Sequence, residues 1–292
     1  MEAPEEKRAQ ELLQQAESTL NQWSWFGSTS KFEDAGELYS KAANNFKIAK
    51  NWEAAANSFL KSAEMSLKTS SQYEAATKYV LAAEMFTRVD PGTSIAHYRE
   101  AIALFSELGR FGAAAKHAEA IAALYEKDSN FKEAVSYYQQ AADYFAGENS
   151  HGRAGKCLEN VARHSASLGD FQRAAEVFEK LGTDALENNL LKFGAKRHFL
   201  HAGFCILARN DLVAARNAVS RFADLDFTFR ESSECKLLEN LVAACSEFDV
   251  DKFADDLFAY DSVRRLDPWE TSVLVRVKNS LGQQASAEDD LR

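Results

Sequence analysis

The chain has 292 residues, 46% of them hydrophobic and 27% charged, and its 34 Lys and Arg against 44 Asp and Glu give a net charge of −10. This balance is typical of a folded soluble protein and excludes a disordered or collagen-like chain. The 48 Ala, and the absence of Pro between Pro91 and Pro268, favour helices over a β-sandwich or Rossmann-type fold. The acidic charge disfavours nucleic-acid binding, which depends on an excess of Lys and Arg.

The N-terminal segment and the cysteines predict a cytoplasmic protein. Residues 1–15 are charged and lack the apolar core of a signal peptide. No stretch approaches the roughly 20 apolar residues of a membrane-spanning helix. The four Cys have none of the close spacings of a zinc or redox motif, so we expect reduced, buried thiols.

An aromatic segment at residues 22–29 follows the N-terminal helix. Trp23, Trp25 and Phe26 precede a run of small polar residues, a pattern typical of a loop tip rather than a helix face. The segment is either a hydrophobic plug over the first hairpin or a membrane-interface anchor, because Trp prefers the lipid headgroup region.

From Phe32 onward, the sequence repeats with a period of about twenty residues. In most units, an aromatic residue is followed three places later by Ala, and the alanines of the repeat are Ala35, Ala55, Ala76, Ala96, Ala114, Ala134, Ala154 and Ala174. Ser71 with Glu74 has capping-box spacing, while Gly109 and Gly169 are typical of helix stops. We therefore predict an all-α, tetratricopeptide-like right-handed solenoid, a curved sheet of antiparallel helical hairpins, over residues 1–210.

The repeat weakens after about Asn210. The apolar residues that follow keep no fixed period, so we expect a C-terminal helical bundle over residues 211–281. Residues 282–292 hold few apolar side chains and are predicted to form a flexible acidic tail. The tail ends in an acidic cluster and one Leu, which would be either a docking peptide for a basic partner or a solvated terminus.

No motif indicates an enzyme or a cofactor. The sequence has neither a phosphate-binding glycine loop nor a nucleophile elbow. His198, His201 and Cys205 can share one helix face, but such a zinc site would lack a fourth ligand. We expect an ordinary helix and no metal there.

Basic residues recur at related places in successive units, namely Arg88, Arg110, Lys116, Arg153, Lys156, Lys196 and Arg197. Equal positions in successive repeats line one face of a solenoid, so these side chains would form a basic patch on an acidic protein. The alternative is an ordinary solvated helix face.

Several segments, in order along the whole chain, resemble the soluble NSF attachment protein family in its alpha type. They are Trp25–Gly27 with Ser30–Tyr39, Lys47–Ala55 (KIAKNWEAA), Gly109–His117 (GRFGAAAKH), Lys156–Leu158, Leu190–Lys196 (LLKFGAK), Glu234–Leu238 (ECKLL), Tyr260–Trp269 (YDSVRRLDPW) and Asp289–Arg292 (DDLR). The resemblance implies an adaptor that coats the SNARE four-helix bundle on membranes and recruits the hexameric ATPase NSF to disassemble it. A tetratricopeptide-like peptide-binding scaffold or co-chaperone is the alternative.

The resemblance also assigns residues. It implies contacts of Arg88, Arg110, Lys116, Lys156, Leu190 and Lys196 with syntaxin-type and related SNAREs, membrane attachment by Trp23, Trp25 and Phe26, and NSF binding by Asp289, Asp290 and Leu291. It implies no catalysis and no cofactor. The protein is expected to be a monomer when free, to bind in several copies per SNARE complex, and to associate peripherally with the cytosolic face of membranes.

Overall fold

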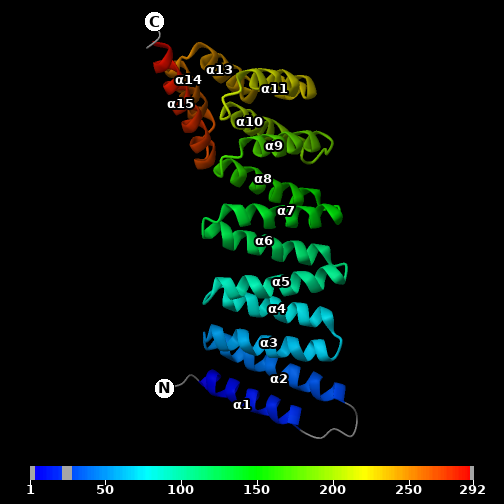
Figure 1. The fold of residues 1–292 in the computed structure, drawn as a ribbon. Helices are drawn as coiled ribbons and strands as arrows, with labels where there is room; N and C mark the ends of the chain where they lie inside the picture. The colour runs from blue at the N-terminus through cyan, green and yellow to red at the C-terminus, as the bar shows by residue number, and fades with distance from the viewer. Residues whose placement is uncertain (1–3, 22–27, 290–292) are drawn as a thin grey trace. The chain divides into compact units, whose positions relative to one another are not determined.

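The computed structural model describes residues 4–21 and 28–289, and all regular elements in these ranges are helical (Figure 1). The helices are α1 (Pro4–Asn21), α2 (Ser28–Ile48), α3 (Trp52–Lys68), α4 (Gln72–Phe86), α5 (Pro91–Glu107), α6 (Phe111–Lys127), α7 (Phe131–Gly147), α8 (His151–Ser167), α9 (Phe171–Leu186), the 3-10 helix η1 (Lys192–Gly194), α10 (Ala195–Leu207), α11 (Leu212–Leu225), α12 (Phe227–Arg230), α13 (Ser233–Glu247), α14 (Val250–Val263) and α15 (Pro268–Asp289). The predicted all-α fold of helical hairpins is confirmed.

The chain forms two compact units. Unit 1 comprises residues 1–129 and 140–154, and unit 2 comprises residues 130–139 and 155–292. The chain passes from unit 1 to unit 2 just before α7, returns within α7, and passes to unit 2 again within α8.

In unit 1, consecutive helices pack through small side chains. Ala35, Ala55, Ala76 and Ala114, all alanines of the predicted repeat, are 0% exposed. Because Ala adds little bulk, neighbouring helices approach closely, and large rings such as that of Phe59 fill the spaces between them.

The repeat register in α5 differs from the prediction. Ala96 is exposed, and Ser94 takes the buried position, where its hydroxyl donates to the Ala83 carbonyl at 2.7 Å. The cause lies in the preceding turn, where Asp90 accepts hydrogen bonds from the Gly92 and Thr93 amides. With Pro91 at the first helical position, this cap starts α5 from an extended residue rather than from the left-handed turn used elsewhere.

Most of the other turns between helices contain one residue with a left-handed backbone. These residues are Lys50, Ser70, Gly109, Ser129, Asn149, Gly169, Asn210 and Phe248, with φ between +56° and +85°. The predicted stops at Gly109 and Gly169 are therefore confirmed. The predicted capping box at Ser71 is wrong, because the Ser71 hydroxyl makes no cap and instead accepts a hydrogen bond from Thr69 Oγ1 at 3.2 Å.

Unit 2 has one continuous core. It runs from Ala162 in α8 to Leu281 in α15, so the boundary predicted near residue 210 falls inside a shared core. The tail prediction needs correction, because α15 continues through Gly282 as far as Asp289. Buried Leu281 anchors this helix, and the Gln- and Ala-containing sequence that follows has good helix propensity.

Candidate functional site

Unit 1 contains a basic hollow at one end of α6, which we name the α6 hollow. Its volume is about 440 Å³, and its lining residues are Tyr73, Arg110, Gly112, Ala113, Lys116, Phe145, Glu148, Ser150 and Arg153. Arg110 and Lys116 are exposed, and neither forms an ion pair with a carboxylate of the described residues. Two of the predicted SNARE-binding residues therefore come together with Arg153, which the repeat pattern had grouped with them.

Local structure fixes the basic side chains of the hollow. Arg110 is the residue before α6, directly after the left-handed Gly109, and Lys116 lies between one and two turns into the helix. The Arg153 guanidinium lies 4.1 Å from the centre of the Phe145 ring and 3.6 Å from Glu119. A guanidinium stacked on a ring is pre-positioned and loses little freedom when it binds a partner.

A carboxylate closes one wall of the hollow. Glu148, in the turn after α7, accepts a hydrogen bond from the Gly112 amide at 2.7 Å. Amides in the first turn of a helix have no partner within the helix, so this bond caps α6. A side chain at position 112 would overlap the Glu148 carboxylate, which explains the Gly within the GRFGAAAKH segment.

Arg88 lies apart from the lining of the hollow. It is exposed just after α4, and its guanidinium stacks 4.5 Å from the centre of the Trp52 ring. Trp52 therefore orients an exposed positive charge, in addition to opening α3.

Unit 2 contains the other predicted SNARE-binding residues. Lys156 is exposed on α8, and Lys196 is half-buried in the first turn of α10. Leu190, which is 89% exposed, lies in the segment between α9 and η1. Phe193, which lies within η1, is 81% exposed. The residue assignment missed it, although it stands within the LLKFGAK segment. Two exposed apolar side chains with Lys192 and Lys196 form a mixed apolar and basic surface.

The remaining predicted site residues lie at or beyond the limits of the described chain. Trp23, Trp25 and Phe26 lie outside the described residues, between α1 and α2. Asp290 and Leu291 also lie outside them, and Asp289 is the last residue of α15.

The histidines of α10 take part in packing. His201 is 0% exposed, and its Nε2 lies 2.6 Å from Glu270 Oε1. Burial raises the pKa of the Cys205 thiol and lowers the pKa of His201. Among the described residues, no group of three or more His, Cys, Asp or Glu side chains is arranged to hold a metal ion.

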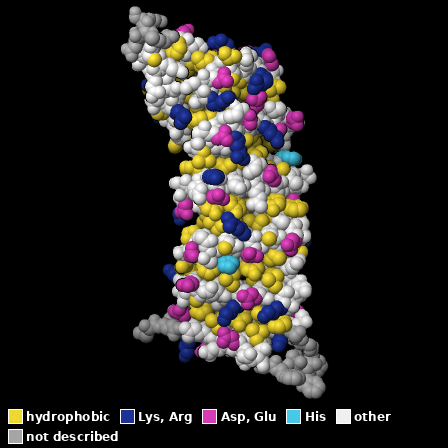
Figure 2. Space-filling model, viewed as in Figure 1, with side chains coloured by type: hydrophobic (Ala, Val, Ile, Leu, Met, Phe, Trp, Pro, Cys, Tyr) yellow, Lys and Arg dark blue, Asp and Glu magenta, His cyan; other side chains and the backbone are white. Residues whose placement is uncertain are grey.

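Charged residues of both signs alternate over the visible face of each unit, with apolar side chains between them (Figure 2). In the described part of the chain, no helix is long and apolar enough to cross a membrane.

Fold and site together define a helical-hairpin protein that offers exposed basic and apolar side chains on its helices and turns. The family described as "Soluble NSF attachment protein, SNAP" matches residues 7–282. The chain belongs to this family.

Two curated relatives illustrate the similarity. The human protein named alpha-soluble NSF attachment protein is 40% identical over 98% of each chain. The probable vesicular-fusion protein sec17 homolog of Schizosaccharomyces pombe is 33% identical over 91% of each chain. Among solved structures, BtubC (BKLC) from P. vanneervenii has a TM-score of 0.42 and 15% identity, over 79% of this chain and 94% of that chain.

Proposed function

We propose that this chain is an adaptor that binds assembled SNARE complexes and brings NSF to them, so that NSF takes the SNAREs apart during vesicle trafficking. The family description and the human relative's name support NSF as a partner. The fission-yeast relative's name supports a role in vesicle fusion. In this role the chain is a binding protein and not an enzyme.

The observation that carries the SNARE-binding surface is the α6 hollow. A chain of net charge −10 exposes Arg110 and Lys116 together, with Arg153 held beside them. Unpaired cations next to a stacked guanidinium favour an acidic partner. An exposed ion pair contributes at most about 1 kcal/mol, so binding must come from many contacts and remain reversible.

Residues outside the hollow extend the proposal. Lys156 and Lys196 add positive charge in unit 2, while Leu190 and Phe193 add apolar contact area. Arg88, stacked on Trp52, adds a further cation in unit 1. These side chains would contact syntaxin-type and related SNAREs.

Membrane and NSF contacts complete the proposal. Trp23, Trp25 and Phe26 would insert into the headgroup region at the cytosolic face of the membrane, which gives weak and reversible attachment. Asp289, Asp290 and Leu291 would engage NSF. Several copies of the adaptor, each a monomer when free, would surround one SNARE complex and gain affinity through multivalency.

A charge reversal tests the SNARE-binding surface. Lys116→Glu should weaken co-sedimentation with a folded SNARE complex, while Lys7→Glu, the same charge change at an exposed site on α1, should not. Equal binding of the two variants would contradict the role of the α6 hollow. Preference for isolated peptide tails over the folded complex would instead support the peptide-binding scaffold.

A further inference from the structure

The start of α15 is fastened to two other helices of unit 2 through one carboxylate. Asp267 Oδ2 accepts a hydrogen bond from Arg163 Nη2 of α8 at 2.7 Å and from Arg197 Nη2 of α10 at 2.9 Å. Two guanidinium groups from different helices therefore meet at one oxygen atom. We call Asp267 with Arg163 and Arg197 the α15 clamp.

The same carboxylate also caps α15. Asp267 Oδ1 accepts from the Glu270 amide at 2.8 Å, and Glu270 Oε2 accepts from the Asp267 amide at 2.7 Å. This reciprocal pair is a capping box, and it orients the first turn of α15. The clamp and the cap share one side chain, so the position and the direction of α15 are set together.

Aromatic and imidazole side chains pack around Arg163 and the Glu270 carboxylate, whereas the Arg197 side chain is 53% exposed. The Trp269 ring lies 5.4 Å from the Phe178 ring and 5.1 Å from the Arg163 guanidinium, while its Nε1–H donates to the Arg163 carbonyl at 3.1 Å. His201 Nε2–H donates to Glu270 Oε1 at 2.6 Å. The Arg163–Asp267 pair, with side chains 22% and 26% exposed, is therefore partly shielded from solvent, unlike an exposed ion pair.

The charge states follow from these contacts. Burial opposes the charged form of Asp267, but the hydrogen bonds from the Glu270 amide and Arg163 outweigh burial and lower its pKa. Burial likewise opposes the charged form of Glu270, and the hydrogen bond from His201 is the largest contribution to its lowered pKa. At neutral pH, the carboxylates of Asp267 and Glu270 face two guanidinium groups and a neutral imidazole, and Glu159 of α8 lies 3.3 Å from Arg163 Nε.

The clamp joins α8 and α10, which carry proposed SNARE-binding residues, to α15, which leads to the proposed NSF-binding end. α8 bears Lys156 and α10 bears Lys196, next to Arg197, whereas α15 leads to Asp289 at the start of the NSF-binding end. The core side chains Val273, Leu274, Val277 and Leu281 also pack α15 into unit 2. Loss of the clamp should therefore loosen the first turns of α15 without unfolding the unit.

We propose that Asp267 is a positioning residue that holds α15 in a fixed orientation relative to the SNARE-binding helices α8 and α10. The clamp transmits to the bound SNARE complex the force that NSF applies at the C-terminal end of α15. This inference rests on the proposed function, but it assigns to Asp267 a role in coupling rather than in binding either partner.

The test separates coupling from binding. ATP-dependent SNARE disassembly by NSF is measured over a range of adaptor concentrations for the full chain, Asp267→Asn and Arg197→Gln. Asp267→Asn should lower the maximal rate by roughly threefold or more, with little change in the half-saturating adaptor concentration, because binding groups stay in place while coupling is lost. Arg197→Gln keeps the hydrogen bond between Arg163 and Asp267, so its maximal rate should lie between those of Asp267→Asn and the unmodified chain.

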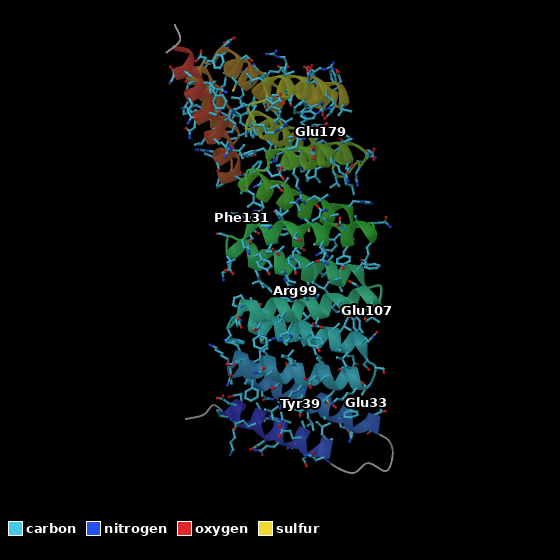
Figure 3. All side chains as sticks on the ribbon, viewed as in Figure 1. Glu33, Tyr39, Arg99, Glu107, Phe131 and Glu179 are labelled. Carbon is cyan, nitrogen blue, oxygen red and sulfur yellow. The ribbon has the colours of Figure 1, made fainter. Side chains whose placement is uncertain are left out.

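The matched control is Glu179→Gln. Glu179 of α9, labelled in Figure 3, forms hydrogen bonds of 2.8 and 2.7 Å with Arg221 of α11, so it is also an arginine–carboxylate link between helices of unit 2. It does not touch α15, and we expect its maximal rate to equal that of the unmodified chain. Thermal melting of each variant shows whether the fold is retained.

Each outcome has a distinct meaning. A maximal rate for Asp267→Asn equal to that of Glu179→Gln would overturn the clamp's role, and so would a loss confined to SNARE affinity. If Asp267→Asn fails to fold, the test rests on Arg197→Gln. A maximal disassembly rate for Arg197→Gln equal to that of the unmodified chain would then overturn the inference. If the unmodified chain supports no disassembly, the proposed function itself fails.

Discussion

Glu148 Oε1 accepts a hydrogen bond from the Gly112 amide at 2.7 Å, so a carboxylate from the turn after α7 caps the first turn of α6. The bond joins residues 36 positions apart in the sequence. It also holds one wall of the α6 hollow, next to Arg110 and Lys116.

Gly112→Ala should leave unit 1 less stable than Gly147→Ala does. Both changes replace a helical Gly by Ala, which has the higher helix propensity, but only the methyl group at position 112 would displace the Glu148 carboxylate, and loss of a helix cap costs about 1 kcal/mol. Urea unfolding should show a lower midpoint for Gly112→Ala than for Gly147→Ala. Gly147→Ala is the control, since a Cβ at position 147 meets no atom within 4 Å. Equal midpoints for the two variants would contradict the importance of this cap.

Ser129→Gly should stabilise the protein by about 0.5 kcal/mol. Ser129 has φ +57°, a conformation that costs a non-glycine residue about 1 kcal/mol. Gly removes this cost, but it loses more conformational entropy on folding, so only part of the gain remains. Thermal melting should show a higher Tm. The neighbouring change Asp128→Gly, at φ −84°, relieves no such cost and should not raise Tm. A higher Tm for Asp128→Gly than for Ser129→Gly would refute the strain argument.

His117 should make stability depend on pH. The imidazole stacks between Tyr98 and Phe105, at 5.6 and 5.7 Å between ring centres, and burial, with a smaller effect of Lys116, lowers its pKa to about 4. A histidine in the unfolded chain has a pKa of about 6.5. Its contribution to stability is therefore complete above pH 6.5 and is lost progressively as the pH falls toward 4.

His117→Phe keeps an aromatic ring between the two neighbours but removes the titrating group. Its free energy of unfolding should fall less steeply between pH 6.5 and 4.5 than that of the unmodified chain. His151→Phe, at an exposed position at the start of α8, is the control and should keep the original slope. Identical slopes for all three chains would show that His117 does not contribute.

The double variant Lys116→Glu with Lys156→Glu should bind SNARE complexes weakly. Exposed ion pairs are screened by salt, so the loss relative to the unmodified chain should be largest at low ionic strength. Binding isotherms at several salt concentrations measure this dependence. A loss that is independent of salt would point to misfolding instead of lost charge pairs.

Replacement of Trp23, Trp25 and Phe26 by Ser should lower disassembly of SNARE complexes in liposomes but not in detergent. These aromatic side chains are proposed to contribute by membrane insertion, which detergent-solubilised complexes do not require. Equal loss in both settings would favour the alternative, a hydrophobic plug over the first hairpin.

The periodic sequence predicted the helices well, but it could not predict their long-range contacts. The buried alanines and the stops at Gly109 and Gly169 were evident because they recur at a fixed interval. Ala96 was misplaced, because α5 begins at Pro91, directly after the Asp90 cap, and buries Ser94 instead. The position three residues before Ala96 holds Thr93 rather than an aromatic residue, so the repeat is already irregular there.

The site was predictable in part. Arg110 and Lys116 share a helix end and were found from their repeat positions. The Gly112–Glu148 cap and the Asp267 clamp join residues far apart in sequence, so no local pattern indicates them. The repeat pattern also could not identify Phe193 as a surface residue. Outside the repeating helices, the sequence alone does not distinguish an exposed Phe from a buried one.

Disassembly of a preformed SNARE complex by NSF and ATP, with and without this protein, tests the central claim most directly. Release of free SNAREs should require the added protein. Release should be lower when the Leu291→Ala variant is added instead of the unmodified chain. Equal release in the absence of the chain would contradict the proposed adaptor function.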